Sequence, residues 1–269
     1  KSIVGLLYGI ALGEGKVPAP DAGLLKQFPQ YADLDKDPRR LAILVRDVLS
    51  MKMGTEWNEQ LPYTDPKNSE IAMERAKDRY RFVLDRPMTE EPGTSWTYNG
   101  GATAIAAKLI ADGTGMALED YAAKALFAPL GITDFEWVGG SDGVASAASG
   151  LRLNAPDLAK IGRMVANGGK YHGAQVVPED WLAVSFQPRA TIMPGLSYGY
   201  FWWLDGNSEK PRWVSGSGNG GQRLHVVPET GLVLVVFAGN YNQPEAWRMP
   251  VKIIADYVLP EVRKRMGRN

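Results

Sequence analysis

The first part of the chain carries apolar residues at the three- and four-residue spacing of α-helices. The first predicted helix begins at Lys1 and stops at the glycines that follow Leu12. Its apolar face consists of Ile3, Val4, Leu7, Ile10 and Ala11. Further helices are predicted over 41–49, 69–85, 101–111, 118–127 and 156–167, with Asn154 as the N-cap of the last one. The middle of the chain is therefore expected to be mainly helical.

The pattern changes after about Pro194. Runs of β-branched and aromatic residues, separated by Gly, Pro and Asn, predict antiparallel strands over 198–204, 212–214, 223–227 and 232–237. A long helix over 246–266 closes the chain, with an apolar face and basic residues at its C-terminal end. This order predicts an α+β protein of two lobes. Residues 1–16 form the helix that carries the candidate lysine, 17–190 a mainly helical lobe, and 191–269 an antiparallel sheet with its C-terminal helix.

Composition narrows the kind of partner. Thirty basic residues balance thirty acidic ones, so no net charge favours a nucleic acid or an anionic membrane, and a small molecule is the expected partner. The chain has no cysteine, which excludes disulfides, zinc–thiolate sites and thiol nucleophiles. The longest apolar stretch, 232–238, has the length of a buried strand rather than of a membrane span. The compartment stays open, because a signal peptide upstream of Lys1 would not be visible.

Three segments could carry chemistry. Lys1 stands in the first turn of a buried helix, where its amine could take part in covalent chemistry. Tyr98 lies in a polar turn directly before a helix, where it could pass a proton to or from a substrate. The glycine-rich stretch 213–223 joins two predicted strands and could present a free N–H to an oxyanion. Taken singly, each has an ordinary alternative: a helix start, a half-buried aromatic, and a β-bulge or hairpin turn.

Together and in this order, the three segments resemble the class C β-lactamase-related serine hydrolases. That family includes β-lactamases, DD-peptidases, D-aminopeptidases, esterases and hydrolases of nylon oligomers. The similarity extends over nearly the whole chain. It includes the segments Pro92-Gly93-Thr94, Pro129-Leu130-Gly131-Ile132, Gly150-Leu151-Arg152, Asp157-Leu158-Ala159, Tyr198-Gly199-Tyr200, Trp202-Trp203 and the stretch 220–228.

The resemblance implies a role for individual residues. Lys1 would be the activating lysine of a Ser-x-x-Lys motif whose serine precedes the numbered chain, and Tyr98 the tyrosine of the Tyr-x-Asn motif. The backbone N–H of Asn219 would be one oxyanion donor, and the serine N–H the other. Ser217, Gly218, Gly220 and Asn99 are the expected substrate-binding residues. The implied fold is a five-stranded antiparallel sheet flanked by helices, with its first strands upstream of Lys1, and no metal or organic cofactor is implied.

Two departures from the family pattern affect the expected substrate. The tyrosine motif reads Tyr98-Asn99-Gly100, so Gly replaces the third-position Asn, whose hydrogen bonds are lost unless Asn99 compensates. Gly216-Ser217-Gly218 stands where β-lactamases have Lys-Thr-Gly. The missing cation removes a charge-assisted contact to a substrate carboxylate, worth about 1.5–3 kcal/mol. The sequence therefore favours hydrolysis of a small ester or amide through an acyl-enzyme.

Two rival functions stay open, and the chain has two histidines whose role has to be considered. One rival is a β-lactamase or DD-peptidase proper, and the other is a non-catalytic scaffold or binding protein with the same fold. His225 falls within a predicted strand and His172 in a predicted hairpin turn. Neither has metal-ligand spacing or a partner that would complete a Ser-His-Asp triad, so both are expected to be structural.

Overall fold

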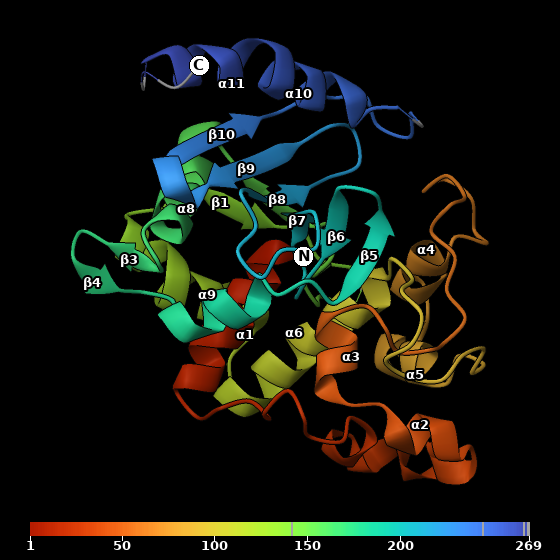
Figure 1. The fold of residues 1–269 in the computed structure, drawn as a ribbon. Coiled ribbons are helices and arrows are strands. Elements are labelled where there is room, and N and C mark those ends of the chain that lie inside the picture. Colours follow the sequence, from red (N-terminus) through yellow and green to blue (C-terminus); the bar gives the residue numbers. More distant parts are fainter. Residues whose placement is uncertain (141, 244, 266, 268–269) are drawn as a thin grey trace.

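An antiparallel sheet of six strands lies between the long C-terminal helix and the remaining helices (Figure 1). The computed structural model describes residues 1–140, 142–243, 245–265 and 267. The strand order is β10-β9-β8-β7-β6-β5, and every neighbouring pair is antiparallel. The strands are β5 (Ala190–Met193), β6 (Leu196–Tyr198), β7 (Trp203–Asp205), β8 (Val214–Ser217), β9 (Arg223–Val227) and β10 (Leu232–Val236). The predicted α+β architecture is confirmed.

The sheet differs from the prediction in several places. The run 198–204 was predicted as one strand, but it turns between β6 and β7, where Gly199 N–H donates to the Trp202 carbonyl at 2.9 Å. Phe201 has a φ of 59° in this turn, so aromatic residues alone did not indicate a strand. The strand β5 was not predicted, and the strand predicted over 212–214 lies at Val214–Ser217. This sheet has six strands within the described residues, whereas the family resemblance implied five in all.

Most helices occupy the predicted regions, often as shorter pieces, but α9 (Glu179–Ser185) was not predicted. They are α1 (Ser2–Gly13), α2 (Pro38–Ala42), α3 (Val45–Leu49), α4 (Ser69–Glu74), α5 (Arg79–Leu84), α6 (Gly100–Thr114), α7 (Leu118–Ala122), α8 (Ala155–Ala166), α9 (Glu179–Ser185), α10 (Arg248–Lys252) and α11 (Leu259–Arg265). Two small hairpins pair β1 (Phe135–Trp137) with β2 (Leu151–Leu153), and β3 (Lys170–Tyr171) with β4 (Ala174–Gln175). Within the described residues, no helix combines the length and the apolar character of a membrane span.

Capping side chains explain where several helices begin. The single helix predicted over 69–85 is in fact α4 and α5, because the Asp78 carboxylate accepts the N–H of Arg81 and starts a new helix. The helix predicted over 41–49 is likewise broken at Ile43, which has an extended backbone between α2 and α3. Asn154 caps α8 as predicted, accepting the Asp157 N–H at 2.8 Å. The closing helix begins at Arg248 rather than 246, and its predicted end, Met266, lies outside the described residues.

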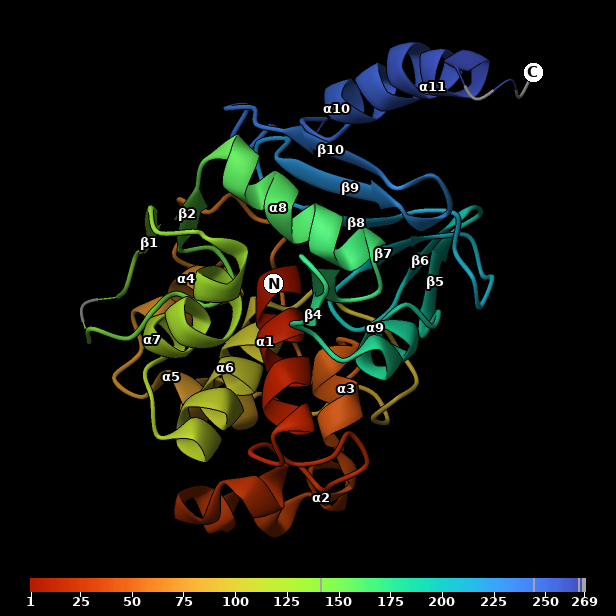
Figure 2. The ribbon, with the colours of Figure 1, turned by 90° about the vertical axis from the view of Figure 1, so that its left-hand side faces the viewer.

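The helix α1 runs through the centre of the molecule and is buried from Ile3 to Ala11 (Figure 2). It packs against α6 and α9. At Gly9 a Cβ atom would overlap the indole of Trp181, which lies against the helix and donates from Nε1 to the Gly5 carbonyl at 2.9 Å. Close packing of this kind fixes the position of α1, and with it the position of Lys1 at its first turn.

Helices cover both faces of the sheet. On one face α8 packs on β9 and β10, where Gly162 allows Leu224 and Val233 to approach the helix backbone. On the opposite face lie α10 and α11 (Figure 2). The N-terminus of α1 lies on the same side of the sheet as α8. The start of α1 is therefore held between the sheet and the helical region.

Candidate active site

The Lys1 amine is buried at the junction of three segments. The side chain is 10% exposed, and its Nζ lies 4.6 Å from the ring centroid of Tyr98 and 3.6 Å from the Glu70 Oε2. These partners come from the turn before α6 and from the first turn of α4. The structure thus brings the predicted lysine and tyrosine together, and adds a carboxylate that the sequence analysis did not identify.

The ring of Tyr98 is fixed by an aromatic cluster. It stacks on Trp203 at the start of β7, with centroids 5.9 Å apart, and it meets Tyr198 of β6 edge-on at 6.4 Å. Trp96 contacts all three rings. Such packing leaves the ring little rotational freedom. The hydroxyl of Tyr98 therefore has a defined position relative to the Lys1 amine.

Asn99, the second residue of the tyrosine motif, begins the following helix. Its Oδ1 accepts the N–H of Ala102 at 3.0 Å, and the residue is only 3% exposed. This is an N-cap contact that fixes the start of α6. Through it Asn99 holds the preceding residue, Tyr98, at the end of the turn. Its expected contact with substrate stays a prediction.

Two carboxylates lie behind Lys1. Glu59, in the loop 55–68, accepts the Trp57 Nε1–H at 2.6 Å, the Tyr63 hydroxyl at 2.9 Å and the Gly100 N–H. Glu70 is 2% exposed, and its Oε2 has no hydrogen-bond partner among the described residues. Two buried carboxylates beside one ammonium make a strongly coupled group.

The proton affinities of Lys1 and Tyr98 depend on this group. Burial alone would lower the pKa of Lys1, but the neighbouring Tyr98, Glu70 and Glu59 outweigh it and raise that pKa well above its ordinary value. Burial raises the pKa of Tyr98, and the positive charge of Lys1 only partly opposes it. At neutral pH both groups therefore hold their protons. Burial also raises the pKa of the Glu59 carboxyl, again against the effect of Lys1.

The glycine-rich segment approaches the start of α1 through Gly216. A Cβ atom at this position of β8 would lie 3.1 Å from the Ser2 Oγ, so the strand passes directly beside the residue that follows Lys1. Ser217 ends β8 and pairs with Arg223 of β9. The lack of a side chain at Gly216 allows this close approach.

The other predicted residues of this segment form the turn between β8 and β9. Gly218 N–H donates to the Gln222 carbonyl at 2.9 Å, and Gly220 has a φ of 106°. Asn219 is exposed, and its side chain exchanges two hydrogen bonds of 3.0 Å with Asn242 in the loop after β10. Its backbone N–H as an oxyanion donor stays a prediction.

A cavity of about 480 Å³ opens beside Tyr98. Its lining residues are Trp57, Glu59, Gln60, Trp96, Thr97, Tyr98, Ile192 and Trp203. Most of this wall is aromatic or aliphatic, and Glu59 contributes a carboxyl. Ligand sites generally combine an apolar wall with a few polar groups. This cavity has both kinds of lining, and Tyr98 itself forms part of its wall.

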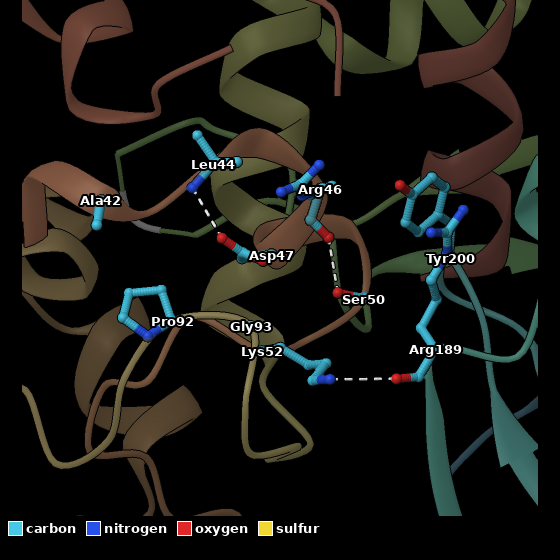
Figure 3. A pocket seen from close by; sticks show the side chains of 10 residues that line it. All are labelled: Ala42, Leu44, Arg46, Asp47, Ser50, Lys52, Pro92, Gly93, Arg189 and Tyr200. Atoms are coloured by element: carbon cyan, nitrogen blue, oxygen red, sulfur yellow. Dashed lines mark hydrogen bonds between the residues drawn. The ribbon is translucent and has the colours of Figure 1, made fainter. Parts of the chain in front are cut away.

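A second cavity, of about 390 Å³, is lined by neither Lys1 nor Tyr98. Figure 3 shows its polar lining, in which Lys52 donates to the Arg189 carbonyl at 3.2 Å and the Asp47 carboxylate accepts the Leu44 N–H at 2.8 Å. The start of the loop 92–98, Pro92 and Gly93, lines this second cavity. The end of the same loop, residues 96–98, lines the cavity beside Tyr98. The cavity beside Tyr98 is therefore the candidate substrate site.

The two histidines lie where the sequence analysis placed them. His172 is in the turn between β3 and β4, with a φ of 47°. His225 is buried in β9 against the ring of Trp213, and burial lowers its pKa to about 4. Neither contacts Lys1 or Tyr98 in any described interaction. Within the described residues, no group of three or more His, Asp or Glu side chains is arranged to hold a metal ion.

The sequence did not indicate the carboxylates or the aromatic cluster. Glu59 and Glu70 lie in a loop and a short helix, at no recognisable spacing from Lys1 or Tyr98. In the sequence, only Gly100 indicated that another polar group was needed. It stands where the family motif has an Asn, and the loss of that side chain at a buried site requires a replacement. Asn99 was expected to compensate, but its Oδ1 accepts the N–H of Ala102 in the helix cap.

Comparison with known proteins identifies the family. The sequence model described as Beta-lactamase matches residues 2–251, which is nearly the whole chain. The protein therefore belongs to the Beta-lactamase family, as the motifs indicated. A 6-aminohexanoate-dimer hydrolase from Paenarthrobacter ureafaciens is 27% identical over an alignment of 258 residues. That alignment covers 87% of this chain and 63% of the relative, so the chain spans less than two thirds of that protein.

Solved structures show the same fold. A putative 6-aminohexanoate-dimer hydrolase from Bacillus anthracis superposes with a TM-score of 0.80 at 19% identity, covering 99% of this chain and 71% of that one. EstCE1, described as a hydrolase with promiscuous acyltransferase activity, superposes with a TM-score of 0.74 at 15% identity, covering 94% and 81%. At these identities the likeness concerns the fold alone.

Proposed function

We propose that this member of the Beta-lactamase family is a serine hydrolase that forms an acyl-enzyme on a small ester or amide. The nucleophile is a serine three residues before Lys1, on the same helix face. The observation that carries the proposal is the buried Lys1 amine, 4.6 Å from the ring centre of a Tyr98 that an aromatic cluster holds in place. A paired amine and phenol beside a cavity is suited to moving a proton between a nucleophile and a leaving group.

In the acylation step the serine proton moves to the neutral form of Lys1 while the serine oxygen attacks the substrate carbonyl. The N–H groups of the serine and of Asn219 hold the oxyanion. As the bond to the leaving group breaks, Tyr98 donates its proton to the leaving oxygen or nitrogen, and Lys1 returns a proton to Tyr98. Water then attacks the acyl carbonyl by the reverse relay, which releases the acid and restores the serine.

The surroundings of Tyr98 support an uncharged, partly apolar substrate. Trp96, Trp203 and Ile192 provide apolar surface in the cavity. The carboxyl of Glu59 also lines it, but Trp57, Tyr63 and Gly100 already donate hydrogen bonds to that group. Gly216 offers no cation for a substrate carboxylate. The relative that is 27% identical is named a 6-aminohexanoate-dimer hydrolase, which agrees with a hydrolytic activity.

Covalent labelling tests the proposal in the full-length protein. A fluorophosphonate probe, which reacts with activated serines, is expected to label the serine three residues before Lys1, as read by peptide mass spectrometry. Prior incubation with a p-nitrophenyl ester should reduce the labelling. Ester hydrolysis without any label at that position would contradict the proposal.

A further inference from the structure

The third position of the tyrosine motif faces two carboxylates. A Cβ atom added to Gly100 would lie 2.8 Å from the Cδ of Glu70 and 3.0 Å from the Oε1 of Glu59. Contacts this short are not compatible with a side chain at position 100 in the present arrangement. The space next to Lys1 that a side chain there would enter is therefore already occupied by groups from other segments.

Glu70 and Glu59 differ in how they are bound. Glu59 accepts hydrogen bonds from Trp57, Tyr63 and the backbone of Gly100, so protein groups already satisfy it. The Oε2 of Glu70 accepts no hydrogen bond among the described residues, and it lies 3.6 Å from the Lys1 Nζ. A buried carboxylate is costly unless a counter-charge compensates it. Lys1 is the cation that does so here.

The backbone around Glu70 directs its side chain toward Lys1. Asn68 caps α4, and its Oδ1 accepts the N–H of Glu70 at 3.0 Å. Asn68 is itself fully buried, and its Nδ2 donates to the Leu61 carbonyl at 2.8 Å. The first turn of α4 is thus anchored to the loop 55–68. This anchoring fixes the carboxylate in the position where it meets the amine.

We propose that Glu70 is the positioning residue of Lys1, and that its carboxylate does the work of the side chain that Gly100 lacks. This inference rests on the proposed function. Glu70 holds the amine beside Tyr98, in reach of the serine one helical turn earlier. The negative charge of Glu70 also stabilises the ammonium form of Lys1, so Lys1 loses its proton and becomes a base only at higher pH.

Other titratable groups also face Lys1 and remain in place when Glu70 is changed. They are Tyr98, Glu59, Tyr63 and Tyr198. Glu59 carries the second negative charge that raises the pKa of Lys1. Replacing Glu70 should therefore lower the pKa of Lys1 only part of the way back to its ordinary value.

The first test is Glu70→Gln in the full-length protein, with ester hydrolysis measured from pH 5 to 11. Gln keeps an oxygen acceptor at the same place and removes the charge. The acid limb of kcat/KM should shift to lower pH by about one to three units, the usual effect of a nearby opposite charge. Glu70→Ala should show the same shift and also a lower plateau, by about 100-fold, because the amine is no longer held.

Glu74→Gln is the matched control. Glu74 lies one turn further along α4 and pairs with Arg79 at 3.2 Å instead of Lys1. The Glu74→Gln variant should have the same acid limb of kcat/KM as the unmodified protein. A purely structural role of Glu70 would lower stability without moving the pH profile, so an unmoved acid limb in Glu70→Gln would overturn the inference.

The second test moves the polar partner of Lys1 from position 70 to position 100. Gly100→Asn alone should lower the melting temperature, since its side chain would meet the Glu70 carboxylate. Combined with Glu70→Ala, the Asn no longer meets the Glu70 carboxylate, and only the Glu59 Oε1, 3.0 Å from its Cβ, has to shift. The Asn then offers Lys1 an amide oxygen, so the double variant should recover part of the stability and of the plateau lost in Glu70→Ala. A double variant no better than Glu70→Ala would contradict the exchange of roles.

The two proposals fail in different ways. If Lys1→Met and Tyr98→Phe leave ester hydrolysis unchanged, the proposed function fails. If those two variants lose activity while Glu70→Gln keeps both the rate and the pH profile of the unmodified protein, the proposed function stands and the role of Glu70 is wrong.

Discussion

The Lys1 ammonium lies over the ring of Tyr98, 4.6 Å from its centroid, although a whole helical region separates the two residues in the sequence. Each is held from its own side: Lys1 by the buried helix α1, and Tyr98 by stacking on Trp203 and by the Asn99 cap of α6. The contact is therefore a consequence of packing between rigid elements. Rigid placement of this kind is what proton transfer requires.

Removing the Tyr98 hydroxyl should affect chemistry far more than folding. Tyr98→Phe keeps the stacked ring, so the free energy of unfolding should change by no more than about one net hydrogen bond, 0.5–1.5 kcal/mol. The kcat for ester hydrolysis should fall by about 100- to 10,000-fold, the range for a general acid–base group. Urea denaturation and steady-state assays on the same preparation measure both quantities. Unchanged hydrolysis would mean that Tyr98 only packs.

The pH dependence follows from the raised pKa of Lys1. Lys1 acts as a base only when neutral, and the surrounding negative charge keeps it protonated at neutral pH. The kcat/KM for esters should therefore still be rising as the pH increases above 7, toward the raised pKa. A pH–rate profile with a chemically stable ester measures this. A plateau already reached at pH 6 would show that Lys1 is not the base.

Substrate preference should reflect the absence of a cation at Gly216. Short p-nitrophenyl esters should be hydrolysed measurably, whereas nitrocefin and benzylpenicillin, which carry a carboxylate, should be turned over far more slowly. Gly216→Lys would introduce the charge, but its Cβ would approach Ser2 Oγ to 3.1 Å, so the comparison is best made with the unmodified protein. Equal kcat/KM values for esters and penicillin would refute the preference.

Packing of α1 can be tested separately from catalysis. Gly→Ala within a helix ordinarily stabilises a protein, by up to about 1 kcal/mol. At Gly9 the added methyl group would overlap Trp181, so Gly9→Ala should instead destabilise the fold by about 1–3 kcal/mol. Gly239→Ala is the control, because nothing lies within 4 Å of its Cβ position. Equal melting temperatures for the two variants would show that α1 is packed less tightly than described.

The sequence predicted most of the architecture because the architecture depends on local patterns. Helical periodicity identified α1, α6 and α8, and β-rich runs identified β9 and β10. Helical periodicity did not reveal that the helices predicted over 41–49 and 69–85 are interrupted. The first is broken by the extended backbone of Ile43, and the second by Asp78, which caps a new helix.

The candidate site was only partly predictable for a different reason. Lys1 and Tyr98 lie in recognisable local contexts, a helix start and a turn before a helix. Glu70 has no such context, because its position next to Lys1 depends on how α4 packs against α5 and α6. A buried charge pair between distant segments is a property of the tertiary structure. Only the unusual Gly100 pointed to a missing partner.

The most direct test of the account is a double-mutant cycle on ester hydrolysis by the full-length protein, using Lys1→Met and Tyr98→Phe. If both residues serve one proton-transfer step, either single change disables that step, and the double variant should lose much less than the product of the two single losses. Losses that simply multiply would show that Lys1 and Tyr98 act independently, and that their contact in the structure has no part in the chemistry.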